Sequence, residues 1–147
     1  MKGTADMSAS GYFIEDLTTG MSASFGKTIS EADIVMFAGV SGDTNPVHLD
    51  QTFAEKTPFK TRIAHGMLSA GFISTVIGTK LPGPGAIYMS QTLRFKAPVK
   101  IGDTVTATCT ITEIIPDKKR CVLSTVCKVG DTVVIEGEAL IMVPSRK

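Results

Sequence analysis

The stretch from His65 to Thr79 constrains the fold more than any other, because its apolar residues point almost all the way round a helix. A helix that is hydrophobic on every side must be covered by the rest of its chain. The stretch also contains Gly66, Gly71 and Gly78. Glycine lowers helix propensity, so these positions predict a close approach of other backbone or of a ligand. The apolar residues of the stretch are Met67, Leu68, Ala70, Phe72, Ile73, Val76 and Ile77.

After the turn Leu81–Gly85, the sequence changes from helical to strand-like periodicity. Segments rich in Val, Ile and Thr follow one another with short connections, a pattern that favours an antiparallel sheet. One more segment of this kind precedes the apolar helix. We therefore predict an α+β fold in which a long central helix is wrapped by a five-stranded antiparallel sheet. The expected strands are Ser22–Ile29, Ala86–Phe95, Thr104–Ile115, Cys121–Val129 and Thr132–Val143.

The length of 147 residues is enough for one domain with a hydrophobic core of its own. We expect residues 1–20 to form a flexible N-terminal tail and residues 21–147 to form the domain. The net charge is +1, and no basic stripe with interleaved aromatic residues is present. The sequence therefore predicts no nucleic acid partner.

Several features favour a cytoplasmic protein. No run of about 18 apolar residues occurs, so no membrane span is expected. The N-terminus lacks the apolar stretch of a secretory signal. The cysteines Cys109, Cys121 and Cys127 have no metal-ligand spacing. Their odd number is consistent with free thiols in a reducing compartment, and their strand-like surroundings predict that they are buried.

A seven-residue run, Gly42–His48, has the composition of a catalytic turn. It places the carboxylate of Asp43 five positions before the imidazole of His48, with Asn45 and Pro46 between them to stiffen the turn. An acid and a base held in this way can polarise one water molecule. The alternative is an ordinary helix-ending turn. At average residue frequencies, however, five fixed residue types in a seven-residue window occur by chance at roughly one start position in a million.

Short helices are predicted on both sides of this run. Ser30 followed by Asp33 has the spacing of a capping box, with Asp in place of the usual Glu. A helix should therefore begin there and continue to about Val40. The acidic and basic stretch Asp50–Lys60 predicts a second, brief helix followed by a loop.

The start of the apolar helix is a candidate site for a developing negative charge. Gly66 lies where backbone N–H groups have no partner within the helix and the helix dipole is positive. Ala70, Ser74 and Ile77 follow it at intervals of 4, 4 and 3 residues and therefore share its helical face. Small residues on that face would leave a slot for a ligand, with Ile77 further along it. The alternative for Ser74 is a hydrogen bond to its own i−4 carbonyl.

The segment Phe37–His48, with Ala54 after it, resembles the hydratase-2 motif of the MaoC-like dehydratases, which include the (R)-specific enoyl-CoA hydratases. The segments Ala64–Leu68 and Pro82–Val99 continue the likeness, which extends from about Ser30 to the C-terminus. The resemblance implies a hotdog fold and a homodimer, or a higher homo-oligomer, whose sheets join edge to edge. It also implies stereospecific, reversible hydration of trans-2-enoyl thioesters to (R)-3-hydroxyacyl thioesters.

The resemblance also implies a role for each motif residue. Asp43 and His48 form the catalytic dyad, and the N–H group of Gly66 forms the oxyanion hole. Ser74 supports the dyad and Asn45 orients it. The chemistry agrees, because hydration needs a proton taken from water, a negative charge held on the thioester oxygen and a proton delivered to the α-carbon. No metal or cofactor is expected, since coenzyme A or acyl carrier protein is part of the substrate.

Other polar residues are weaker candidates for contacts with a ligand. His65 either contacts the substrate or packs and caps the helix start. The set His48, Asp50 and His65 is an alternative metal site, although its spacing follows no firm rule. Two or three basic residues are expected to meet the phosphates of coenzyme A. The candidates are Lys56, Lys60, Arg62, Arg94, Lys96 and Lys100.

Three rival functions stay open. A 3-hydroxyacyl-ACP dehydratase of fatty-acid synthesis would share the motif and differ in the carrier of the acyl group. A hotdog thioesterase would hydrolyse the thioester instead of hydrating the alkene. A non-catalytic acyl-thioester-binding module would need neither an acid nor a base, so the presence of both Asp43 and His48 disfavours it.

Overall fold

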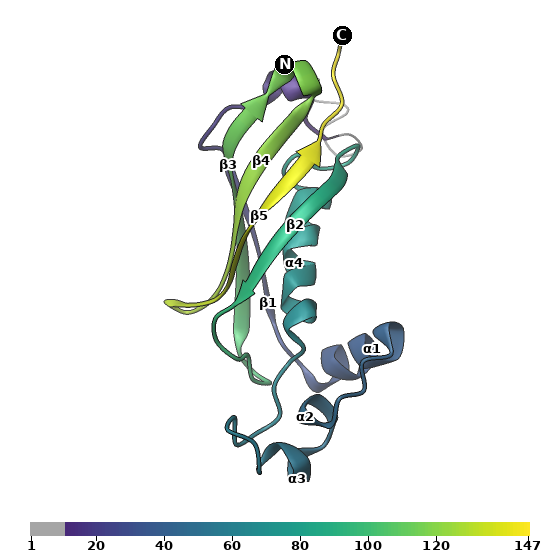
Figure 1. Ribbon diagram of the computed structural model, residues 1–147, viewed down its shortest axis with the longest axis vertical. Coiled ribbons are helices and arrows are strands. Elements are labelled where there is room, and N and C mark those ends of the chain that lie inside the picture. The colour runs from purple at the N-terminus through teal and green to yellow at the C-terminus, as the bar shows by residue number, and fades with distance from the viewer. Residues whose placement is uncertain (1–10) are drawn as a thin grey trace.

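An antiparallel sheet of five strands curls around one long helix in the computed structural model, which describes residues 11–147 (Figure 1). The strand order is β1-β3-β4-β5-β2, so β1 and β2 form the edges of the sheet. The predicted α+β fold is confirmed, and the expected strand boundaries agree to within one residue. The strands are β1 (Ser22–Thr28), β2 (Ile87–Phe95), β3 (Thr104–Ile115), β4 (Arg120–Val129) and β5 (Thr132–Met142).

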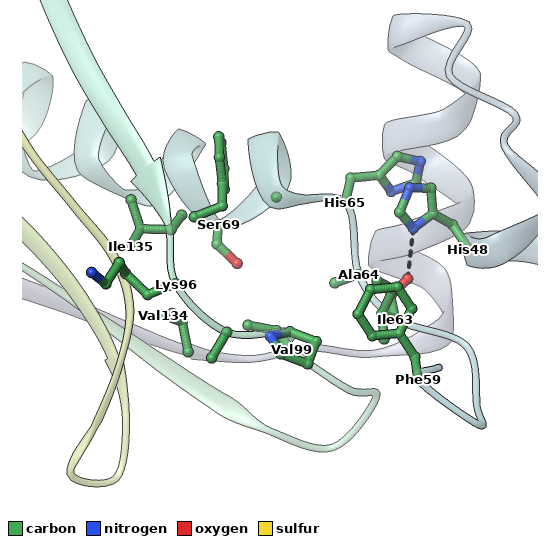
Figure 2. Close-up of a pocket in the computed structure, with 14 residues that line it drawn as sticks. His48, Phe59, Ile63, Ala64, His65, Ser69, Lys96, Val99, Val134 and Ile135 are labelled. Atoms are coloured by element: carbon green, nitrogen blue, oxygen red, sulfur yellow. Dashed lines mark hydrogen bonds between the residues drawn. The ribbon is translucent and has the colours of Figure 1, made fainter. Parts of the chain in front are cut away.

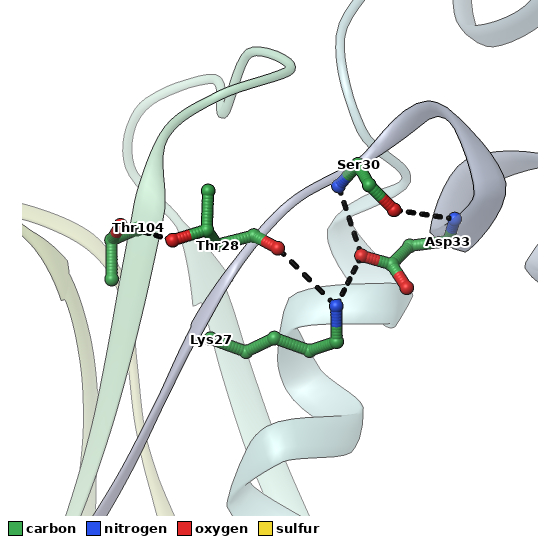
Figure 3. Close-up of polar contacts among 5 residues, drawn as sticks. All are labelled: Lys27, Thr28, Ser30, Asp33 and Thr104. Carbon is green, nitrogen blue, oxygen red and sulfur yellow. Dashed lines mark hydrogen bonds and ion pairs between the residues drawn. The ribbon is translucent and has the colours of Figure 1, made fainter.

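Alternation of apolar and polar residues decides which face of the sheet meets the helix. In β3, Val105 and Ala107 are fully buried, whereas Thr104 and Thr106 point to the outer face. On that outer face the hydroxyl of Thr104 forms a hydrogen bond with the hydroxyl of Thr28 on the edge strand β1, at 2.6 Å (Figure 3). Because the side chains alternate with a period of two residues, burial of one face also fixes the register of the strands.

The helix α4 (Gly66–Thr79) lies in the concave face of the sheet, where it contacts β1, β3, β4 and β5. Ile73 and Val76 are fully buried there. The opposite side of the helix is open within the described chain, because Met67 is 55% exposed and Ser74 is exposed as well. A single sheet encloses one side of a helix only. The prediction that the chain covers this helix on every side is therefore wrong for residues 11–147.

The glycines of α4 do not share one explanation. A Cβ atom at Gly66 would lie 2.5 Å from the ring of Phe95, so any larger residue would have to displace that ring. A Cβ atom at Gly71 or Gly78 would meet no atom of the described residues within 4 Å. The expected close approach is confirmed at Gly66, and no described neighbour accounts for the other two.

Three short helices form an overhang beyond one end of the sheet (Figure 1). The first begins with the predicted capping box, in which the N–H of Asp33 donates to Oγ of Ser30 at 3.2 Å and the N–H of Ser30 donates to Oδ2 of Asp33 at 2.9 Å (Figure 3). The ammonium group of Lys27 bonds to the same carboxylate and holds the pKa of Asp33 below its usual range. The helices are α1 (Glu31–Ser41), α2 (Pro46–Leu49) and α3 (Gln51–Ala54).

Residues 11–20 belong to the packed domain and correct the expected tail of residues 1–20. Ile14 and Leu17 are each 5% exposed and join the hydrophobic core, with a short 3-10 helix (Ile14–Asp16) between Phe13 and Leu17. The N–H of Gly11 donates to the carbonyl of Pro84 at 2.9 Å. Apolar residues at positions 14 and 17 were the sequence signal for this packing. Residues 1–10 lie outside the described part of the chain.

The three cysteines are fully buried and unpaired, as predicted. Burial raises the pKa of Cys109 to about 12 and the pKa values of Cys121 and Cys127 to about 11. Among the helices described for residues 11–147, none is long and apolar enough to cross a membrane.

Replacement of Leu17 by Ala tests whether the segment 11–20 is part of the core. We expect Leu17→Ala to lower the free energy of unfolding by about 2–5 kcal/mol, the usual cost of a cavity left by a buried leucine. Urea denaturation followed by circular dichroism measures this change. Val40→Ala is the control, because Val40 is 89% exposed and its truncation should change the stability by less than about 0.5 kcal/mol. Equal stabilities of the two variants would contradict the assignment.

Candidate active site

The run Gly42–His48 forms the turn that ends α1 and begins α2. Gly42 has φ = 79°, in the left-handed region that glycine adopts without strain, and it terminates α1. Asn45 caps α2, because its side-chain oxygen accepts a hydrogen bond from the N–H two residues later at 3.1 Å. Pro46 occupies the first helical position, where its missing N–H costs nothing. The turn therefore holds the acid just before α2 and the imidazole within it.

His48 is a buried imidazole with one free nitrogen. Its Nδ1 lies 2.8 Å from the carbonyl oxygen of Ile63, and because a carbonyl only accepts, Nδ1 carries the proton (Figure 2). Nε2 of the neutral ring is then left with a lone pair. Burial is the main effect that lowers the pKa of His48, and the nearby His65 lowers it further. The hydrogen bond to Ile63 and the carboxylate of Asp43 act in the opposite direction. The result is an uncharged base with a single reactive nitrogen.

Asp43, His48 and His65 come together at the start of α4. One ligand atom from each of the three side chains lies within 4.8 Å of the others. His65 is 2% exposed, and its ring stacks on the ring of His48 with centroids 3.9 Å apart and an interplanar angle of 27°. Asp43 is exposed. The structure thus brings the predicted acid and base together, and it adds His65 to them.

The predicted metal set of His48, Asp50 and His65 is not assembled. Asp50 instead caps α3, where its carboxylate accepts a hydrogen bond from the N–H of Phe53 at 3.2 Å. Asp43, His48 and His65 are the group of metal-ligating residue types found among residues 11–147. The stacked rings of the two histidines lie in nearly parallel planes, however, so their in-plane lone pairs cannot converge on one ion. The arrangement suits proton transfer better than metal binding.

Gly66 is the first residue of α4, and the cap position before it leaves the helix end open. His65 occupies that position and makes no side-chain hydrogen bond to the helix. The N–H of Leu68 donates to the carbonyl of His65 at 3.1 Å. The N–H groups of Gly66 and Met67 have no carbonyl of a preceding helical turn to bond to, and they lie at the positive end of the helix dipole. Such N–H groups can bind an oxygen that gains negative charge during a reaction.

A cavity of about 310 Å³ opens beside these residues. His48, His65 and Gly66 line it, as do residues from the end of β2, from the connection after it and from β5 (Figure 2). Its walls are largely apolar, which suits an acyl chain or the thioester arm of a carrier. The other lining residues are Phe59, Ile63, Ala64, Ser69, Phe95, Lys96, Ala97, Pro98, Val99, Val134 and Ile135.

Four of the predicted substrate-binding residues, and the predicted catalytic Asp43, are not among the residues that line this cavity. The four are Asn45, Ala70, Ser74 and Ile77. Ala70 and Ile77 are 9% and 2% exposed and belong to the hydrophobic core, while Ser74 lies on the exposed side of α4. Each step of four residues advances about 40° round a helix, so Ser74 lies about 80° from Gly66 and reaches the open side. The sequence spacing predicted the angles between these residues around the helix, but it did not predict which side of the helix faces the sheet.

Sequence analysis missed the wall of the cavity opposite α4. The run Phe95–Val99 supplies five lining residues, of which only Lys96 was a candidate for a ligand contact. Ser69 was also missed; its buried hydroxyl has no hydrogen-bond partner among residues 11–147. Among the basic candidates, Lys96 lines the cavity. Its Nζ lies 3.5 Å from Oε1 of Glu136, with which it forms an ion pair. Arg62 instead forms an ion pair within the overhang, where its guanidinium lies 2.7 Å from the carboxylate of Glu31.

The fold and the site together define a class, the hotdog proteins of the MaoC type. The MaoC like domain matches residues 15–136, and the chain belongs to this family.

Two curated relatives and one solved structure show how similar individual members are. The (R)-specific enoyl-CoA hydratase of Rhodospirillum rubrum is 63% identical over 135 residues, which cover 92% of this chain and 94% of that protein. The 3-hydroxybutyryl-CoA dehydratase of Methylorubrum extorquens is 53% identical and covers 92% of this chain, with 86% of its own length matched. The R-hydratase PhaJ1 from Pseudomonas aeruginosa, solved in the unliganded form, aligns with a TM-score of 0.87 at 46% identity, covering 92% of this chain and 88% of that one.

The lowered pKa of His48 gives a prediction for the pH dependence of the reaction. A base works only when it is unprotonated, so hydration should decline as the pH falls through the pKa of His48. Because burial lowers that pKa, the acidic limb of a plot of kcat/KM against pH should lie below the value of 6.5 typical of histidine. Initial rates with crotonyl-CoA between pH 4.5 and 9 measure the limb. A limb at or above 6.5 would contradict the assignment of His48 as the base.

Proposed function

We propose that this chain catalyses the stereospecific, reversible hydration of trans-2-enoyl-CoA to (R)-3-hydroxyacyl-CoA. The observation that carries the proposal is the 63% identity with the (R)-specific enoyl-CoA hydratase of Rhodospirillum rubrum over nearly the whole of both chains. The grouping of Asp43 and His48 beside the first N–H groups of α4 supports it. Hydration of a conjugated thioester needs these two elements, a base for water and a site for the enolate oxygen.

Each group has one task in the proposed mechanism. The thioester oxygen binds the N–H of Gly66, and one water molecule lies between Asp43 and His48. Nε2 of His48 takes a proton from this water as its oxygen bonds to the β-carbon, and the electron pair of the alkene moves onto the thioester oxygen. Asp43 orients the water and stabilises the imidazolium that forms. The imidazolium then returns the proton to the α-carbon, so the enzyme ends in its starting state.

The reaction as proposed uses no metal and no cofactor. Negative charge develops only on the thioester oxygen, where the helix N-terminus stabilises it. Coenzyme A enters as part of the substrate, and Lys96 at the cavity is the basic residue best situated to meet its phosphates.

We further propose that two copies of the chain associate through the β2 edge and the open side of α4. Ile87 and Met89 on this edge strand are 57% and 40% exposed, and Met67 on α4 is 55% exposed. An unpaired edge strand with exposed apolar residues favours pairing with a second strand. The small residues Gly71 and Ser74 on the open side of α4 leave room for a second helix. A homodimer in the cytoplasm is the assembly that we expect.

Variants of the dyad test the chemistry. We expect Asp43→Asn and His48→Gln each to lower kcat by about 10²–10⁴, because each removes a group that takes part in proton transfer. The double variant should lose far less than the product of the two factors, since the pair acts as a unit. The measurement is the loss of enoyl-thioester absorbance with crotonyl-CoA. Asp50→Asn is the matched control, because Asp50 caps α3 outside the cavity and its loss should leave kcat nearly unchanged.

The same assay separates the rival functions. Release of free thiol during the reaction, without a hydrated product, would indicate a thioesterase. A much higher kcat/KM with crotonyl-ACP than with crotonyl-CoA would indicate a dehydratase of carrier-bound acyl groups. No turnover of either thioester would leave an acyl-thioester-binding module.

Charge on the β2 edge tests the dimer. We expect Met89→Lys to convert the dimer to a monomer, because a lysine on each copy would bring two like charges together at the paired edges. Sedimentation velocity at micromolar concentration measures the mass in solution. Ile101→Lys is the control, since Ile101 is comparably exposed at 41% but lies in the connection between β2 and β3. A wild-type monomer, or an unchanged dimer in Met89→Lys, would contradict the proposed interface.

A further inference from the structure

His65 joins the two halves of the proposed active site. It directly precedes Gly66, whose N–H is the proposed oxyanion site, and its side chain reaches back to the turn that carries the dyad. Its Nε2 lies 2.9 Å from the backbone carbonyl oxygen of Asp43. Because that oxygen only accepts, Nε2 carries the proton and donates it to the hydrogen bond. One side chain therefore connects the dyad loop to the start of α4.

The ring of His65 contacts two other rings. On one side it stacks on His48, with ring centroids 3.9 Å apart, and it also packs against Phe37 of α1 at 4.8 Å between centroids. Figure 2 shows the rings of His65 and His48 side by side. His65 is 2% exposed. A buried ring with a hydrogen bond at its tip and contacts to two other rings has little rotational freedom. Its position therefore limits where the ring of His48 can lie.

The cap position of His65 has a second consequence. A typical cap residue such as Ser or Asp places its side-chain oxygen over the helix start, where it accepts a hydrogen bond from the N–H of the second or third helical residue. His65 forms no such bond, because its side chain is turned toward Asp43 instead. No cap side chain therefore covers the helix start beside the N–H of Gly66, which stays open to a ligand. The same rotamer that anchors the dyad loop also keeps the oxyanion site free.

We propose that His65 is a positioning residue, which sets the Asp43–His48 pair relative to the N–H of Gly66 without contacting the substrate. The inference rests on the proposed hydratase function, and it replaces the expectation that His65 binds the substrate. It also accounts for Nδ1 of His65, one of three buried side-chain polar atoms without a partner among residues 11–147. When Nε2 donates to Asp43, Nδ1 of the neutral ring keeps only a lone pair. Nδ1 therefore needs no partner for His65 to act through its hydrogen bond to Asp43 and its stacking on His48.

Several charged groups surround the two imidazoles and bear on a pH profile. Asp43 raises the pKa of His48, while His65 lowers it, in addition to the larger effect of burial. Arg62 donates to the backbone carbonyl of His48 at 2.6 Å, but its charge is paired with Glu31. Lys96 lines the same cavity from the other side. Because His65 lowers the pKa of His48, loss of the imidazole at position 65 should raise that pKa.

Two substitutions separate the hydrogen bond from the ring contacts. His65→Phe keeps an aromatic ring between Phe37 and His48 but has no donor for the carbonyl of Asp43. His65→Gln keeps an N–H donor but has no ring. We expect His65→Phe to lower kcat for crotonyl-CoA about 10²-fold with KM changed by less than about threefold, because displacement of a catalytic group by about 1 Å has effects of this size. His65→Gln should recover part of the lost kcat.

The titration of His48 provides a readout that does not depend on turnover. The chain contains only two histidines, so His48 is the only imidazole left in either variant. Its NMR signal therefore reports the pKa of His48 without overlap, and we expect this pKa to rise together with the acidic limb of kcat/KM. Phe37→Leu is the matched control, because it removes the ring that packs on His65 and keeps both histidines. It should lower Tm and leave the acidic limb unchanged.

Each result distinguishes between explanations. A large rise in KM with unchanged kcat in His65→Phe would overturn the inference and restore His65 as a substrate contact. A loss of activity that only follows a lower Tm, with the pKa of His48 unchanged, would overturn it in favour of a structural role. Wild-type activity in both variants would overturn it as well. An inactive wild-type chain would instead overturn the hydratase function, on which the inference rests.

Discussion

The packing of α4 against the concave face of the sheet is the interaction on which the rest of the structure depends. Ile73 and Val76 are fully buried in that contact, and burial of each such side chain stabilises the fold by about 1.5–3 kcal/mol. The same contact fixes the N-terminus of α4 at the end of the sheet from which the overhang extends. The overhang then attaches to this helix start through His65. The packing of the apolar core therefore determines where the polar residues of the site lie.

The two members of the proposed dyad have different surroundings, and this difference supports different tasks for them. His48 is buried, and one of its ring nitrogens is occupied by the carbonyl of Ile63. Asp43 is exposed, and its carboxylate accepts a hydrogen bond from the N–H of Asn45 at 3.2 Å. Burial disfavours a charge on the imidazole, whereas contact with water carries no such penalty for the carboxylate. The difference in burial therefore favours an uncharged His48 as the base and a charged Asp43 as the group that orients water.

The sequence predicted well what depends on neighbours along the chain. Alternation of Thr with Val and Ala identified β3, and the spacing of Ser30 and Asp33 identified the start of α1. The proximity of Asp43 and His48 also followed from a spacing of five residues across a stiff turn. What could not be predicted depends on which side of α4 faces the sheet. The spacing of residues 66, 70, 74 and 77 indicated a slot on one helical face, but the cavity of the described chain lies on the side of Ser69 and is closed by Phe95–Val99.

The buried thiols of the sheet have a chemical consequence for a protein that handles enoyl thioesters. An α,β-unsaturated thioester is an electrophile, and a thiolate adds readily to its β-carbon, the atom that water attacks in the proposed reaction. Only the deprotonated thiol is nucleophilic. Cys109, Cys121 and Cys127 are fully buried, and their pKa values of about 12, 11 and 11 keep them protonated at neutral pH. The β-strands that build the core therefore also protect the protein from alkylation by its own substrate.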